Sequence, residues 1–140
     1  MKTLLCLAWH ILTAAAATET PPCPQYTTID GTEVIYFQPK VSTGVLFVAH
    51  GCSHAATDWF DQCDSCPKCG ISTGEGLPQE KQVVDIALAR SFTVIAISSS
   101  DRWRKCWTLR DFGHVTRVLK KLRNELRFVL IIQCTLKNAP

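Results

Sequence analysis

The most informative segment of the chain reads Val45-Leu46-Phe47-Val48-Ala49-His50-Gly51-Cys52-Ser53-His54. Its first five residues form an unbroken apolar run, which is typical of a β-strand buried on both faces. A His-Gly pair ends the run, and a cysteine-rich segment follows. Strands of this kind belong to sheets that helices cover on both sides, so the segment favours an α/β protein.

The regions on either side extend this interpretation. Asp30-Gly31 predicts the turn of a β-hairpin over residues 26–39. Further predicted elements are two more buried strands, Phe92–Ile97 and Phe128–Ile132, and two helices, Pro78–Ala89 and Phe112–Leu126. The expected fold class is therefore α/β, an N-terminal β-hairpin followed by a partial, mostly parallel βαβαβ sheet.

The N-terminal segment indicates export. Lys2 precedes an apolar run over residues 4–12, and small residues follow over Ala14–Ala17. This pattern is typical of a cleaved signal peptide, which we assign to residues 1–17, with one domain over residues 18–140. A buried N-terminal helix and a retained signal anchor are the alternatives. The expected location is outside the cell or in the lumen of the secretory pathway.

Composition sets limits on the function. The chain has 140 residues, 46% of them hydrophobic and 19% charged, which suffices for one hydrophobic core and excludes wholesale disorder. Its net charge of +3 does not require a polyanionic partner. Basic side chains are concentrated in residues 102–127, where we interpret them as a solvated helix face. We expect no nucleic-acid partner and, after signal cleavage, no membrane partner.

The cysteines predict disulfides. An oxidising lumen favours bridges among Cys23, Cys52, Cys63, Cys66, Cys69 and Cys106, with the pairing left open. Cys6 would leave with the signal peptide, and Cys134 remains as the odd cysteine. The Cys63-x-x-Cys66-x-x-Cys69 run, together with Cys52 or His54, also has the ligand types of a zinc site. We favour disulfides, and we assign no metal and no cofactor.

The His50-Gly51 strand end resembles the turn that donates a main-chain N–H to the oxyanion hole of α/β-hydrolases. The resemblance extends from about Gly44 to Ile132 and implies a relation to secreted serine esterases and lipases. It makes the main-chain N–H groups of Gly51 and Cys52 oxyanion-hole candidates. His50 itself is expected to have a structural role, bonding to the backbone near the turn.

The same resemblance predicts a missing nucleophile. The family places a Gly-x-Ser-x-Gly elbow after the strand at 128–132, where this chain reads Gln133-Cys134-Thr135. Gly70-Ile71-Ser72-Thr73-Gly74 matches the motif but lacks a preceding strand, so Ser72 is not assigned as a nucleophile. We therefore expect a truncated hydrolase relative without activity of its own. No catalytic residue is assigned, and a small-molecule ester substrate belongs only to a full-length relative.

A second hypothesis makes the chain a secreted, cysteine-rich binding protein that is not an enzyme. Its working part would then be the segment from Cys63 to Cys69 of the cysteine-rich loop 52–76, braced by disulfides or loaded with zinc. Trp103 and Trp107 follow a buried strand, where they would line a pocket or pack in the core. A third hypothesis is that the chain does not fold stably by itself. Its last predicted strand, 128–132, would then leave an unpaired apolar sheet edge, and we expect poor solubility or self-association through that exposed edge.

Overall fold

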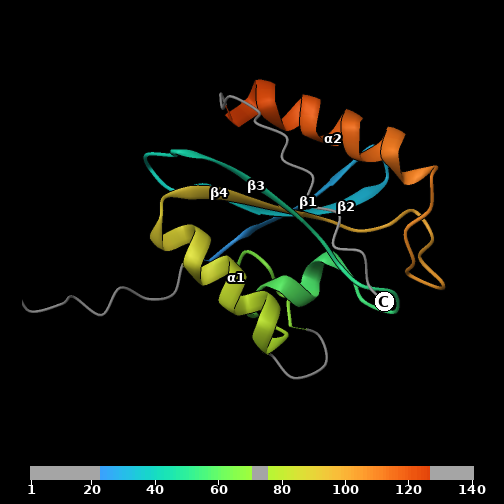
Figure 1. Ribbon diagram of the computed structural model, residues 1–140, viewed down its shortest axis with the longest axis horizontal. Coiled ribbons are helices and arrows are strands. Elements are labelled where there is room, and N and C mark those ends of the chain that lie inside the picture. The colour runs from blue at the N-terminus through green and yellow to red at the C-terminus, as the bar shows by residue number, and fades with distance from the viewer. Residues whose placement is uncertain (1–22, 71–75, 127–140) are drawn as a thin grey trace, which may run out of the picture.

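One four-stranded sheet, covered by a helix on each face, organises the chain (Figure 1). The computed structural model describes residues 23–70 and 76–126. In chain order, the elements are β1 (Gln25–Ile29), β2 (Thr32–Phe37), β3 (Gly44–Ala49), the 3-10 helix η1 (Ala56–Trp59), α1 (Pro78–Ala89), β4 (Phe92–Ile97) and α2 (Asp111–Leu126). The predicted hairpin, two of the three predicted strands and both helices are thus confirmed, while residues 128–132 lie outside the described residues.

The expectation of a mostly parallel βαβαβ sheet is wrong. The strand order is β1-β2-β4-β3, in which β1–β2 and β2–β4 pair antiparallel and β3–β4 pair parallel. The physical reason is that the hairpin does not stand apart from the sheet. Its second strand, β2, hydrogen-bonds directly to β4, so the small sheet is mixed and differs from the arrangement implied by the α/β-hydrolase resemblance.

A two-residue turn determines the direction of β2. Asp30 and Gly31 have φ angles of 49° and 75°, the left-handed conformation that a tight hairpin requires at both central positions. The turn brings Ile29 opposite Thr32, and the antiparallel register then extends to Gln25 opposite Tyr36. Asp and Gly tolerate this conformation better than most residues, which is why the sequence signal was reliable here.

Each face of the sheet has its own core. One core packs β2, β3 and β4 against η1, α1 and the cysteine-rich loop, and its fully buried members include Ile35, Val94 and Cys66. The other packs the sheet against α2 through Val118, Leu119 and Leu122. Successive residues of β4 alternate between these cores, which explains why almost the whole strand is apolar and buried.

β3 forms one edge of the described sheet. It pairs with β4 on one side, from Gly44 opposite Phe92 to Ala49 opposite Ile97. Its central residues are half-buried, although they are as apolar as those of β4. The predicted self-association concerned the edge of the strand at 128–132, which lies outside the described residues, and it stays a prediction.

Substitution in β4 tests the two-core arrangement. Ile95 is fully buried, so Ile95→Ala should lower the free energy of unfolding by about 2–5 kcal/mol. Ile86 on α1 is 47% exposed, and Ile86→Ala should cost less than about 1 kcal/mol. Urea unfolding of both variants at neutral pH measures the difference. Equal losses would contradict the placement of Ile95 at the centre of the sheet.

Candidate functional site

His50, directly after β3, joins the carboxyl ends of the two parallel strands. Its Nε2 accepts a hydrogen bond from the Ser99 amide at 2.9 Å, and its Nδ1 therefore donates to the Gly51 carbonyl at 2.7 Å. The side chain is buried, and burial lowers the pKa of the imidazole. Both ring nitrogens are engaged by main chain, so the expected structural role of His50 is confirmed.

Trp107 covers this strand end. Its Nε1 donates to the His50 carbonyl at 2.8 Å, and its ring lies 5.2 Å from the imidazole between ring centroids. A disulfide between Cys52 and Cys106 joins the two connections beside it. Gly51 and Cys52 are exposed at this position, and the assignment of their main-chain N–H groups to an oxyanion hole stays a prediction.

Asp111 anchors the connection between β4 and α2. Its carboxylate accepts hydrogen bonds from the Ser100 amide at 2.6 Å and from the Thr108 amide and hydroxyl at 2.6 and 2.9 Å. Burial by itself would raise the pKa of Asp111, but the hydrogen bonds from Ser100 and Thr108 outweigh it and hold the pKa at about 2. One ionised side chain thus ties both ends of the connection together.

The prediction of disulfide bonds is confirmed. The six candidate cysteines form three pairs, Cys23–Cys63, Cys52–Cys106 and Cys66–Cys69. Each cysteine proposed as an alternative zinc ligand is therefore part of a disulfide, Cys66 with Cys69, Cys63 with Cys23 and Cys52 with Cys106. Across residues 23–70 and 76–126, no group of three or more His, Cys, Asp or Glu side chains is placed to hold a metal ion. The sequence did not reveal the connectivity because disulfide pairing depends on which loops meet in space.

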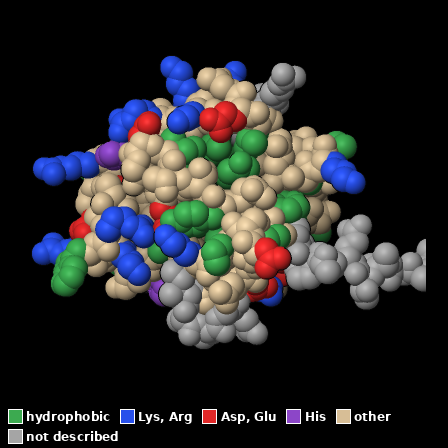
Figure 2. Space-filling view, turned by 180° about the vertical axis from the view of Figure 1, so that it is seen from behind, with side chains coloured by type: hydrophobic (Ala, Val, Ile, Leu, Met, Phe, Trp, Pro, Cys, Tyr) green, Lys and Arg blue, Asp and Glu red, His purple; other side chains and the backbone are tan. Residues whose placement is uncertain are grey.

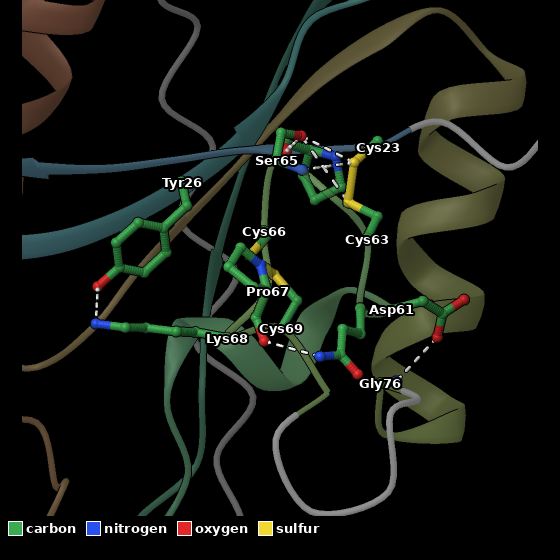
Figure 3. Close-up of a disulfide and its surroundings, with 12 residues drawn as sticks. Cys23, Tyr26, Asp61, Cys63, Ser65, Cys66, Pro67, Lys68, Cys69 and Gly76 are labelled. Atoms are coloured by element: carbon green, nitrogen blue, oxygen red, sulfur yellow. Dashed lines mark hydrogen bonds between the residues drawn. A yellow bond between two sulfur atoms is a disulfide. The ribbon is translucent and has the colours of Figure 1, made fainter.

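The cysteine-rich loop is further tied down by polar contacts to distant segments (Figure 3). The Ser65 hydroxyl donates to the Pro24 carbonyl at 2.6 Å, next to the Cys23–Cys63 bridge. Lys68 reaches Tyr26 on β1, with 3.4 Å between Nζ and the phenolic oxygen, as Figure 3 shows. These contacts fix the loop against the sheet.

A hollow of about 250 Å³ opens between this loop and α1. Its lining combines apolar and charged side chains: Trp59, Phe60, Asp61, Gln62, Cys63, Lys81, Val84, Asp85 and Leu88. Asp61 pairs with Lys81 across it and accepts a hydrogen bond from the Gly76 amide at 2.9 Å. Burial would raise the pKa of Asp61, but the bonds to Lys81 and Gly76 lower it overall.

Trp59, one of the residues that line the hollow, contains an unpaired donor. Its side chain is only 8% exposed, and its buried Nε1 has no hydrogen-bond partner among residues 23–70 and 76–126. Unpaired buried N–H groups are rare because they lose their water without gaining a partner. Sequence analysis placed Trp59 within the hydrolase-like segment but gave it no role. Only the packing of the loop on α1 shows that its N–H is unpaired.

The polar side chains at the end of β4 are committed to structural bonds. Ser98 donates from its hydroxyl to Glu33 at 2.6 Å and accepts from the Ala56 amide at 2.9 Å. The Ser99 hydroxyl bonds the Asp101 carbonyl at 3.4 Å. Ser72, in the literal Gly-x-Ser-x-Gly match, and Cys134, the odd cysteine, lie outside the described residues.

A small acidic cluster surrounds His54. Its Nδ1 lies 3.3 Å from Oδ2 of Asp58, and Asp58 also accepts a hydrogen bond from the Ala55 amide at 2.9 Å. Glu80 on α1 lies nearby, where burial and the charge of Asp58 raise its pKa against the opposing influence of His54. One Glu80 carboxylate oxygen is buried without a hydrogen-bond partner. Beside this cluster, the Leu77 amide donates to the Asp58 carbonyl at 2.8 Å and joins η1 to the start of α1.

No family model, curated protein or solved structure matches this chain. None of the helices within the described residues is long and apolar enough to cross a membrane. The three disulfides mark the chain as a cysteine-rich protein of the secreted type.

The pKa of Asp111 predicts a pH-dependent contribution to stability. A lowered folded-state pKa stabilises the fold above the ordinary carboxyl pKa of about 4, and this stabilisation is lost as the pH falls towards 2. Asp111→Asn should therefore cost about 2 kcal/mol at pH 7 and much less near pH 2. Unfolding curves across this range measure it, with exposed Asp64→Asn as control. A cost that is independent of pH would refute the assignment.

Proposed function

We propose that the chain is a secreted, disulfide-braced binding protein without enzymatic activity. Its binding site is the hollow between the cysteine-rich loop and α1, which takes one apolar side chain and an adjoining carbonyl group of a peptide or protein partner. The observation that carries this proposal is that Trp59, a lining residue of the hollow, has a buried N–H that is unpaired among the described residues.

The unpaired donor supports a ligand with a hydrogen-bond acceptor. A buried polar group without a partner costs about 1–3 kcal/mol, and a ligand that supplies a carbonyl recovers this cost on binding. The apolar lining by Phe60, Val84 and Leu88 supports an aliphatic or aromatic group beside that carbonyl. A peptide unit offers both groups at adjacent positions.

The size of the hollow limits its ligand. At about 250 Å³, it is smaller than the sites that enclose drug-sized molecules, which begin at about 300 Å³. It is large enough for one side chain of a larger partner. Insertion of a single anchoring side chain into a desolvated pocket is a common basis of protein–protein binding.

The charges at the hollow favour a partner with a cation next to its apolar anchor. Asp61 and Asp85 line the hollow, and Lys81, the basic residue of the lining, is already paired with Asp61. The surplus acidic charge attracts a positively charged flank and repels a negatively charged one.

The disulfides support binding rather than catalysis. Cys63 lines the hollow and is bridged to Cys23, which precedes β1, while Cys66 and Cys69 form a second bridge in the same loop. A wall held in one conformation loses little entropy when a ligand binds. By contrast, the polar side chains at the ends of the parallel strands, those of His50, Ser98 and Ser99, are engaged in hydrogen bonds within the protein.

Binding is tested with two capped dipeptides, N-acetyl-Leu-Arg-amide and N-acetyl-Leu-Glu-amide. Titration of ¹⁵N-labelled protein should move the indole N–H resonance of Trp59 downfield as its hydrogen bond forms. We expect the arginine peptide to bind about fivefold more tightly, because it matches the acidic lining. The preference should shrink as salt is added.

Matched tryptophan variants identify the donor. Trp59→Phe keeps an aromatic ring but removes the N–H, and should weaken the arginine peptide about tenfold. Trp103→Phe changes a side chain that is 93% exposed and should leave the affinity unchanged. Retained affinity in Trp59→Phe, with an unchanged melting temperature, would show that the N–H binds no ligand. No shift with either peptide would reject the site.

Ester hydrolysis tests the competing hypothesis of a hydrolase. The oxidised protein should not accelerate hydrolysis of p-nitrophenyl butyrate above the buffer rate. Saturable turnover that Ser72→Ala abolishes and Ser53→Ala leaves intact would overturn the non-enzymatic assignment. In that case, Ser72 in the Gly-x-Ser-x-Gly motif would be the nucleophile.

A further inference from the structure

The connection between β4 and α2, together with the first turn of α2, exposes three large hydrophobic side chains. Trp103, Leu109 and Phe112 are 93%, 97% and 78% exposed, although side chains of this size are usually at least partly covered. Together with the exposed Arg102, Arg104 and Arg110, they form what we call the 102–112 surface. Figure 2 shows Lys and Arg side chains gathered at this end of the molecule, with a hydrophobic side chain protruding among them.

The backbone that presents these side chains is held in place. The Asp101 carboxylate accepts hydrogen bonds from the amides of Trp103 and Arg104 at 3.1 and 2.9 Å, and the Asp101 carbonyl accepts one from the Lys105 amide at 2.8 Å. Cys106 is bridged to Cys52, and Asp111 binds the segment at Thr108. The hydrophobic side chains therefore project from a fixed turn and do not belong to a loop that could fold them inward.

The charge of the 102–112 surface is positive. Asp111, the acidic residue within its range, is buried and already accepts three hydrogen bonds. Arg102 pairs with Glu33 at 3.0 Å, whereas Arg104 and Arg110 are exposed and form no ion pair within the described residues. The neighbouring α2 adds four exposed basic side chains, Arg117, Lys120, Lys121 and Arg123.

From this combination, we infer that the 102–112 surface docks the protein onto an anionic lipid surface. Exposed Trp, Leu and Phe side chains enter the boundary between headgroups and acyl chains, while Arg and Lys side chains remain among the anionic headgroups. A sulfated polysaccharide or a nucleic acid would pair with the arginines and stack on Trp103. Either of these partners would leave Leu109 and Phe112 in water, so a lipid surface accounts for more of the exposed hydrophobic side chains.

This inference is independent of the proposed peptide site. The hollow lies between the cysteine-rich loop and α1, and it shares no residue with the 102–112 surface. The sequence analysis expected no membrane partner after signal cleavage, and the uncharged run over residues 3–18 is too short to be a convincing membrane span. Peripheral docking needs no such segment and depends on side-chain exposure, which the sequence does not show.

The experiment measures sedimentation of the protein, as recovered from secreting cells, with lipid vesicles. We expect binding to phosphatidylcholine vesicles containing about 30% phosphatidylserine and little binding to pure phosphatidylcholine. Tryptophan emission should shift to the blue, and brominated lipids should quench it. Trp103→Ala and Leu109→Ala should each weaken binding about tenfold, and Arg104→Gln and Arg110→Gln about fivefold each.

Two substitutions at the opposite ends of the same strands provide controls. Val41, which precedes β3, is 75% exposed, and Arg90, which precedes β4, is also exposed. Val41→Ala and Arg90→Gln remove the same kinds of group and should leave vesicle binding unchanged. Circular dichroism and melting temperature establish that all variants are folded.

Three results would overturn the inference. Equal losses in the control variants would mean that vesicle binding does not use the 102–112 surface. Binding to soluble heparin without binding to vesicles would assign the surface to a polysaccharide. A dimer that Trp103→Ala dissociates, with no vesicle binding by either form, would assign it to a second copy of the chain.

Discussion

The parallel pairing of β3 with β4 is the constraint on which the rest of the molecule depends. It brings the carboxyl ends of both strands to the same end of the sheet, where Ala49 lies opposite Ile97. His50 then bridges the two strand ends through the Ser99 amide, and Trp107 closes over its carbonyl. Because the strands end together, the connections that follow them begin together, and the Cys52–Cys106 disulfide can join them. Without this pairing, neither connection would have a fixed origin.

The two connections depart from ordinary burial in opposite ways. The cysteine-rich connection after β3 buries a donor, the Trp59 N–H, without a partner. The connection after β4 leaves Trp103 and Leu109 almost wholly in water. Each departure is costly to an isolated protein, and each is held in place by disulfides or by carboxylate hydrogen bonds. A protein retains an unpaired buried group or an exposed hydrophobic side chain where a binding partner relieves the cost. For this reason, both functional proposals concern these two connections.

The hydrogen bonds at these strand ends explain why the His50-Gly51 pattern resembles that of a hydrolase without providing a catalytic histidine. A catalytic histidine needs one ring nitrogen free to exchange a proton with a nucleophile. His50 instead uses both nitrogens to join main-chain groups, and Ser98 forms hydrogen bonds with Glu33 and Ala56. Polar groups that are satisfied in this way stabilise the edge of the sheet. The resemblance to α/β-hydrolases therefore rests on a local strand-and-turn pattern, and the described residues do not extend it to a shared sheet or a catalytic site.

Local chemistry was enough to predict the individual elements. The Asp30-Gly31 turn, the apolar runs at 45–49 and 92–97, and the helical spacing of Val118 and Leu122 depend on near neighbours, so the sequence carries them directly. Oxidation of the cysteines also followed from their number and from the export that the N-terminal pattern predicts. Strand direction, disulfide partners and exposure join residues far apart in the chain, as in the pairing of β2 with β4 and of Cys23 with Cys63. Only tertiary packing decided these, because the free energy of such contacts depends on which surfaces meet once the core has formed.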